Sequence, residues 1–121
     1  MTDPMRPHAL VLDVAEFEGP VAFWTAAIGY VEWFPGHGQF AGIKPPVLDG
    51  RLAIIFQKVP EPKVVKNRMH VDFEHADMPA EVERLKALGA REIAERSLGP
   101  GSRWTVMEDP FGNEFCVAQA R

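Results

Sequence analysis

Two amphipathic helices with the same glycine ending recur in this sequence, and their spacing restricts the fold more than any other feature. The first is predicted to open at 16–20 and to present one apolar stripe at helical spacing: Pro20, Phe23, Trp24, Ala27 and Ile28. The second is predicted over 77–88, with four residues facing inward: Met78, Val82, Leu85 and Leu88. Gly29 and Gly89, sixty residues apart, are placed to end the two helices. The chain is therefore expected to repeat one structural unit.

Alternating apolar and polar residues predict one strand before each helix and three strands after it. The expected strands are 8–14, 30–34, 39–43 and 52–59 in the first half, and 69–74, 91–96, 103–108 and 114–118 in the second. Turns are expected at 35–38, 98–101 and 109–113, where Gly, Pro and Asn gather. The order βαβββ, given twice, predicts an α+β fold. We expect a single domain over 1–121, with module 1 at about 8–59, a connector at 60–67 and module 2 at about 68–119.

The strand that opens the second half carries a row of polar side chains. Alternation places Val71 and Phe73 on one face, and His70, Asp72 and Glu74 on the other. Such a row on a half-buried strand either faces solvent or lines a site.

Charge and composition exclude several classes of partner. The formal net charge of −4 leaves no basic footprint for nucleic acid or for an anionic membrane surface. No apolar run approaches the ~20 residues of a membrane span, and the first residues show no apolar core of a signal peptide. The single cysteine, Cys116, cannot form an internal disulfide and fits a reducing cytoplasm. We therefore expect a cytoplasmic protein.

Two motifs resemble those of the vicinal oxygen chelate superfamily, which includes glyoxalase I, extradiol dioxygenases, fosfomycin-resistance enzymes and bleomycin-binding proteins. Residues 23–30 resemble its first-helix signature, an aromatic pair followed by Ile-Gly, and residues 108–115 resemble its Asp-Pro-x-Gly-Asn turn into the last strand. With 57–60 and 66–70 between them, the chain is most similar to the bacterial glyoxalase-like subgroup. The resemblance implies sheets curled into a cup with the helices outside, a small-molecule ligand, and a homodimer.

The resemblance also implies four metal ligands, one from the first and one from the fourth strand of each module. His70 and Gln57 take two of these positions, while Ala9 and Cys116 take the other two. Alanine offers no donor atom, and a thiolate suits a soft metal better than the Mg, Mn, Ni or Fe that such enzymes favour. The sequence therefore leaves open whether a divalent metal binds.

Three functions remain open. The first is a protein that binds a small molecule without the full metal site, through a cup wall of Gln57, Asp72, Asp13, Trp33, Trp104 and Cys116. The second is an enzyme, a lyase or isomerase of the glyoxalase type, with His70 or Glu74 as catalytic base. A dioxygenase is disfavoured, because its iron takes two histidines and a carboxylate. The third is a module of a larger assembly or a regulatory fold.

Each candidate residue also has a plainer interpretation. His70 would be hydrogen-bonded to Asp72 or Gln57, and Cys116 would be a buried, inert thiol. The carboxylates would face solvent, and the two tryptophans would belong to the core. The cations of the connector region, Lys63, Lys66 and Arg68, are expected to form a solvated face.

Overall fold

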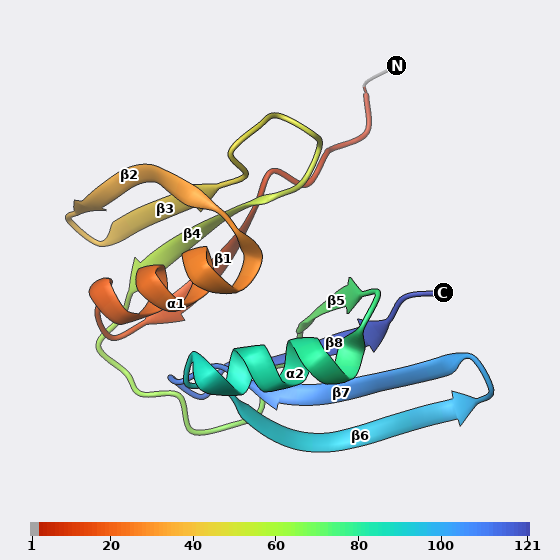
Figure 1. The fold of residues 1–121 in the computed structure, drawn as a ribbon. Coiled ribbons are helices and arrows are strands. Elements are labelled where there is room, and N and C mark those ends of the chain that lie inside the picture. The colour runs from red at the N-terminus through yellow and green to blue at the C-terminus, as the bar shows by residue number, and fades with distance from the viewer. Residues whose placement is uncertain (1–2) are drawn as a thin grey trace. The chain divides into compact units, whose positions relative to one another are not determined.

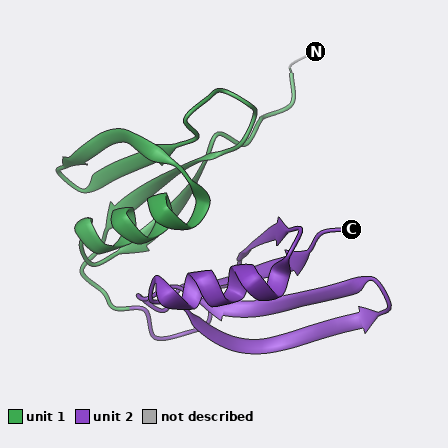
Figure 2. Cartoon of the chain, viewed as in Figure 1, with its two compact units in different colours: residues 1–62 green, residues 63–121 purple. Residues whose placement is uncertain are grey.

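The computed structural model describes residues 3–121 and contains two βαβββ units, unit 1 ending at Pro62 and unit 2 beginning at Lys63 (Figures 1 and 2). Unit 1 consists of β1 (Ala9–Val14), α1 (Glu18–Ile28), β2 (Val31–His37), β3 (Phe40–Lys44) and β4 (Ala53–Lys58). Unit 2 consists of β5 (Val71–His75), α2 (Met78–Ala87), β6 (Arg91–Gly99), β7 (Ser102–Glu108) and β8 (Glu114–Gln119).

Each unit contains one mixed four-stranded sheet, and the two sheets share a topology. The strand orders are β1-β4-β3-β2 and β5-β8-β7-β6. The first and fourth strands of each unit pair in parallel, with Asp13 opposite Gln57 in unit 1 and Asp72 opposite Cys116 in unit 2. The remaining pairs are antiparallel. The predicted α+β fold of two βαβββ modules is confirmed.

One face of each sheet is covered by the helix of its own unit. In unit 1 this face buries Phe56 and Ile43 completely, and α1 buries Phe23 and Trp24. In unit 2 the Thr105 hydroxyl contacts the Met78 sulfur at 3.6 Å. This contact shows that α2 packs on the face of the sheet that carries Thr105. Burying each such apolar side chain contributes roughly 1.5–3 kcal/mol. The opposite face of each sheet is not covered by the helix of its own unit and is here called the helix-free face.

The helix ends follow from local sequence. Gly29 adopts the left-handed conformation at φ 71° and donates its N–H to Thr25 O, as expected. The Asp77 side chain accepts a hydrogen bond from Ala80 N at 3.2 Å and so caps the start of α2. The prediction that Leu88 faces inward was wrong. Leu88 is the C-cap, beyond the last helical turn, and 37% of its surface is exposed.

Two strands differ from their predicted bounds. β2 continues through Pro35 and Gly36 to His37, although 35–38 was expected to be a turn. A proline is tolerated there because β2 is an edge strand with two irregularities in its pairing to β3. β6 likewise runs to Gly99, past the predicted end at residue 96. No helix in the described part of the chain is long and apolar enough to cross a membrane.

Candidate functional site

The helix-free face of the unit 2 sheet is organised in cross-strand rows that follow the strand register. The first row holds Asp72, Cys116, Val106 and Ala94; the second holds Glu74, Ala118, Trp104 and Arg96; the third holds Glu114, Glu108 and Arg91. Because neighbouring strands lie about 4.8 Å apart, side chains within a row are direct neighbours. Five of the residues predicted for the site lie on or beside this face: Asp72, Glu74, Trp104, Cys116 and His70.

Three of these residues form one cluster. His70 Nε2 lies 3.3 Å from Asp72 Oδ1. A nitrogen of His70, an oxygen of Asp72 and the sulfur of Cys116 all lie within 4.8 Å of one another. The imidazole and the carboxylate are exposed, whereas Cys116 is only 3% exposed. Of the two partners considered for His70, the structure shows Asp72.

The Cys116 thiol is protonated at neutral pH. Burial is the main cause that raises its pKa, to about 11, and the charge and hydrogen bond of Asp72 act in the same direction. The positive charge of Lys66 acts against them. A thiol in this setting is a poor nucleophile, which agrees with the inert interpretation of Cys116.

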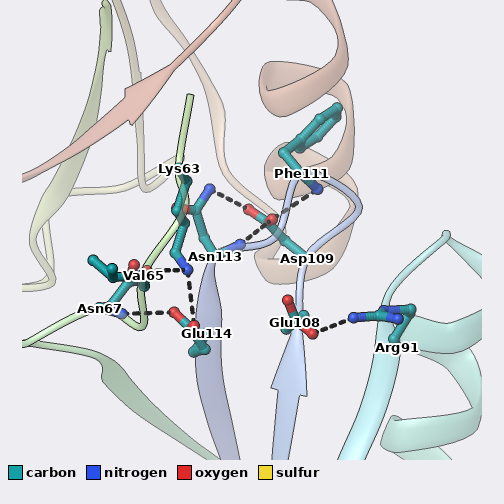
Figure 3. A network of polar contacts seen from close by, with 9 residues as sticks. All are labelled: Lys63, Val65, Asn67, Arg91, Glu108, Asp109, Phe111, Asn113 and Glu114. Carbon is teal, nitrogen blue, oxygen red and sulfur yellow. Dashed lines mark hydrogen bonds and ion pairs between the residues drawn. The ribbon is translucent and has the colours of Figure 1, made fainter. Parts of the chain in front are cut away.

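Glu114, the first residue of β8, holds the connector against this strand through bonds to Lys63 and Asn67 (Figure 3). Lys63 Nζ donates to Glu114 Oε1 at 2.8 Å, and Asn67 N donates to Glu114 Oε2 at 3.1 Å. Burial tends to raise the pKa of Glu114, but the bonds from Lys63 and Asn67 outweigh it and lower this pKa. Lys63 is therefore paired with Glu114, although the residue is exposed as expected. The bond from Asn67 holds the backbone three residues before His70, which itself precedes β5.

The turn before β8 is held by hydrogen bonds to Asp109, and it leads into the strand that carries Cys116. Asp109 is buried, and its Oδ1 accepts hydrogen bonds from the backbone N–H groups of Phe111 and Asn113, both at 2.9 Å. Its Oδ2 accepts from Asn113 Nδ2 at 3.1 Å, and Arg91 pairs with Glu108 beside it (Figure 3). The start of β8 is thus fixed by side-chain bonds as well as by the sheet.

The other predicted site residues lie in unit 1. Asp13 and Gln57 are register partners on the helix-free face of that sheet, with Phe40 next in the row. Trp33 packs edge-on against His8, with ring centroids 6.0 Å apart, and against Phe34 at 5.1 Å. Gln57 and His70, which were predicted together as metal ligands, therefore belong to different units.

The side chains at the four positions implied by the resemblance do not fit a hard divalent ion. Ala9 has no donor atom, and the buried side chain of Cys116 offers a protonated thiol where a carboxylate would be needed.

Sequence reasoning missed two contributors to the site. Glu114 joins the connector to β8, and Lys66 acts electrostatically on Cys116. For Glu114 a signal existed, because it lies two residues before Cys116 and alternation places both on one face. Nothing in the sequence indicated the partner of Lys66.

Comparisons with known proteins identify the family. The profile of the glyoxalase-like domain family matches residues 9–118. A comparison with curated proteins gave no significant match. Solved structures share the fold at low identity. The fosfomycin resistance protein FosX from Listeria monocytogenes is 18% identical with a TM-score of 0.76, over 100% of this chain and 94% of FosX.

Two further solved structures share the fold. Lactoylglutathione lyase from Agrobacterium tumefaciens is 19% identical with a TM-score of 0.68, over 96% of this chain and 94% of that one. A member of the glyoxalase/bleomycin resistance protein/dioxygenase superfamily from Sphaerobacter thermophilus is 16% identical with a TM-score of 0.72, over 95% and 97% of the two chains. With nearly its whole length matched, this chain belongs to the glyoxalase-like domain family, and it has the fold of the glyoxalase/bleomycin resistance protein/dioxygenase superfamily.

Proposed function

We propose that the protein binds a small organic molecule on the helix-free face of the unit 2 sheet. One observation carries the proposal: the row in which Ala118 lies between Glu74 on β5 and Trp104 on β7. Two strand spacings separate the outer backbones, about 10 Å. Ala118, the residue between them, carries only a methyl group. We expect a ring-sized molecule to lie over Ala118, between the carboxylate of Glu74 and the indole of Trp104.

The side chains indicate which ligand chemistry fits. Trp104 is half-buried and offers an aromatic surface to a planar group. The Glu74 side chain has no ion-pair or hydrogen-bond partner within residues 3–121, so its carboxylate is free to accept from a donor or a cationic group. The expected ligand is planar and partly apolar, with an N–H or O–H donor. Binding then needs no hard metal ion, which agrees with the donor set described above.

Thermal-shift screening of metal-free protein against small planar amines, amides and phenols tests this proposal. Hits are expected to raise the melting temperature of the wild-type protein. Glu74→Gln and Trp104→Leu variants should lose most of the shift, whereas Glu95→Gln, exposed on β6, should keep it. Hits that shift all three variants equally would contradict binding at this row.

A second candidate function is a lyase or isomerase of the glyoxalase type. The observation in its favour is the contact of 3.3 Å between His70 Nε2 and Asp72 Oδ1, since a carboxylate beside an imidazole can orient a general base. The structure of a FosX variant with Mn(II) and 1S,2S-dihydroxypropylphosphonic acid shows that one relative binds both a metal and a small molecule. If a substrate is found, His70→Gln and Glu74→Gln should each reduce kcat by 100-fold or more. Unchanged turnover in both variants would exclude this mechanism.

We also propose that the protein works as a homodimer in the cytoplasm. The family resemblance supports the dimer, and the single reduced cysteine supports the compartment. Light scattering of concentrated protein tests the first point, because a strict monomer would contradict it.

A further inference from the structure

We propose that Arg96 binds a carboxylate group of the ligand, so that the protein selects planar molecules with an acid at one end and a donor at the other. Arg96 is the fourth member of the row that contains Glu74, Ala118 and Trp104. The inference rests on the proposed function, because it names the class of ligand for the same row. It adds a group of opposite charge to the Glu74 carboxylate at the other end of this row.

The strand register places the side chain of Arg96 beside the indole of Trp104. These two residues are partners in the antiparallel pair of β6 and β7, and alternation puts both on the helix-free face. On the opposite face of the sheet, Nε and Nη2 of Arg103 donate to Oε1 of Glu95 at 2.9 and 2.6 Å. These bonds join the same two strands next to Arg96 and Trp104, and so hold their register.

The positive charge of Arg96 has no acidic partner in the described part of the chain. The residue is exposed, and its guanidinium makes no ion pair or hydrogen bond within residues 3–121. In the adjacent row the same two strands carry Ala94 and Val106, which are both apolar. The carboxylates of these two rows, Asp72 and Glu74, lie on β5, three strand spacings or about 14 Å from β6. The guanidinium is therefore available to an anion.

The row can hold a planar ligand at three points. Glu74 accepts a hydrogen bond from its donor group, the indole of Trp104 packs against its ring, and Arg96 donates to its carboxylate. The aliphatic part of Arg96 can lie along the indole and bring the guanidinium toward the ligand.

A carboxylate matches the guanidinium in geometry and in charge. Its two oxygens accept the two parallel N–H groups that an arginine presents, and such charge-assisted pairs are stronger than neutral hydrogen bonds. A monoanion suits this row better than a phosphate dianion, because Asp72 and Glu74 place two negative charges at the other end of the sheet. The expected ligand class is therefore the aromatic carboxylic acids that carry an amino or hydroxyl group.

Matched pairs of acid and amide test the inference, because the two members of each pair differ in charge but hardly in shape. The probes are para-aminobenzoate with para-aminobenzamide, and para-hydroxybenzoate with para-hydroxybenzamide. In isothermal titration calorimetry at neutral pH, wild-type protein should bind each acid about tenfold more tightly than its amide. Added salt should narrow this difference, because the guanidinium is exposed.

Substitutions of Arg96 show whether its guanidinium is the cause of this preference. Arg96→Gln should abolish the preference, so that acid and amide bind with equal affinity. Arg96→Lys keeps the charge and should retain part of the preference, since an ammonium group lacks the paired N–H groups. Arg103→Gln is the matched control, because it removes an arginine of β7 that bonds to Glu95 on the other face. This control should prefer the acids as the wild type does.

Equal affinity of acid and amide for the wild type, or an unchanged preference in Arg96→Gln, would overturn the inference. The proposed function would survive that result if the amides bind the wild type and lose affinity in Glu74→Gln and Trp104→Leu. Absence of binding by all four probes would also overturn the inference, whereas neutral hits of the thermal-shift screen would still support the proposed function. Probes that bind Glu74→Gln and Trp104→Leu as they bind the wild type would contradict both.

Discussion

The Lys63 ammonium group lies 2.8 Å from the Glu114 carboxylate, and this pair joins the connector to the strand that carries Cys116. Only 14% of the Glu114 side chain is exposed, so the pair is screened less than a surface pair. We predict that Glu114→Gln lowers the free energy of unfolding by about 1–2 kcal/mol, because Lys63 would lose its ionic partner. Urea denaturation measures this change.

A surface pair in the same unit provides the control. Arg103 and Glu95 bond across β6 and β7, but about half of each side chain is exposed. Glu95→Gln should therefore change the unfolding free energy by less than about 0.5 kcal/mol. Equal effects of the two substitutions would show that Glu114 does not hold the connector.

The buried carboxylate of Asp109 organises the turn before β8 through two backbone donors and one side-chain donor. Asp109→Asn keeps the shape but places an NH₂ group against one of these donors. The expected loss of unfolding free energy is about 1–3 kcal/mol, since a buried donor is left unsatisfied. Thermal unfolding followed by circular dichroism measures it, and an unchanged melting temperature would contradict this role.

The Phe34 ring lies directly over Gly42 on the helix-free face of unit 1. A Cβ atom added at Gly42 would lie 2.5 Å from Cε1 of this ring. Gly42→Ala should therefore destabilise the protein by about 1–3 kcal/mol. The same substitution in a Phe34→Leu background should cost less, because the ring that it meets is gone. Additive effects in this double-mutant cycle would show that the two residues are not in contact.

The raised pKa of Cys116 predicts a loss of stability in alkali. The folded-state pKa, about 11, exceeds the ordinary value of 9.0, so the stabilisation is complete below pH 9 and declines as the pH rises toward 11. The expected loss is roughly 2–3 kcal/mol for metal-free protein. Cys116→Ala should remove this part of the pH dependence between pH 9 and 11. Identical slopes for the variant and the wild type would contradict the burial of a neutral thiol.

Much of the fold could be predicted from the sequence because local signals agreed with it. The helical stripe ending at Gly29, the Asp77 cap and the alternating strands determine both βαβββ units without long-range information. The errors arose where pairing decides the conformation. β2 keeps Pro35 and Gly36 within a strand because its edge position tolerates them, and alternation alone could not show which strand lies at an edge.

The site could be predicted only in part. Alternation placed Asp72 and Glu74 on one face, and the family resemblance drew attention to His70 and Cys116. The proximity of Cys116 to Asp72 depends on the register of β5 against β8, which joins residues forty-four positions apart. The contact of Lys63 with Glu114 likewise depends on tertiary structure. Contacts of this kind cannot be read from spacing along the chain.

The two tryptophans on strands allow the most direct test of the proposed ligand site. Trp104 belongs to the proposed row, whereas Trp33 lies on β2 of unit 1 and Trp24 is buried at 5% exposure. A planar hit from the thermal-shift screen is titrated into metal-free wild type, Trp33→Phe and Trp104→Phe while tryptophan fluorescence is recorded. We predict saturable quenching in the wild type and Trp33→Phe, and its loss in Trp104→Phe. Quenching that survives in Trp104→Phe but disappears in Trp33→Phe would contradict the proposed site.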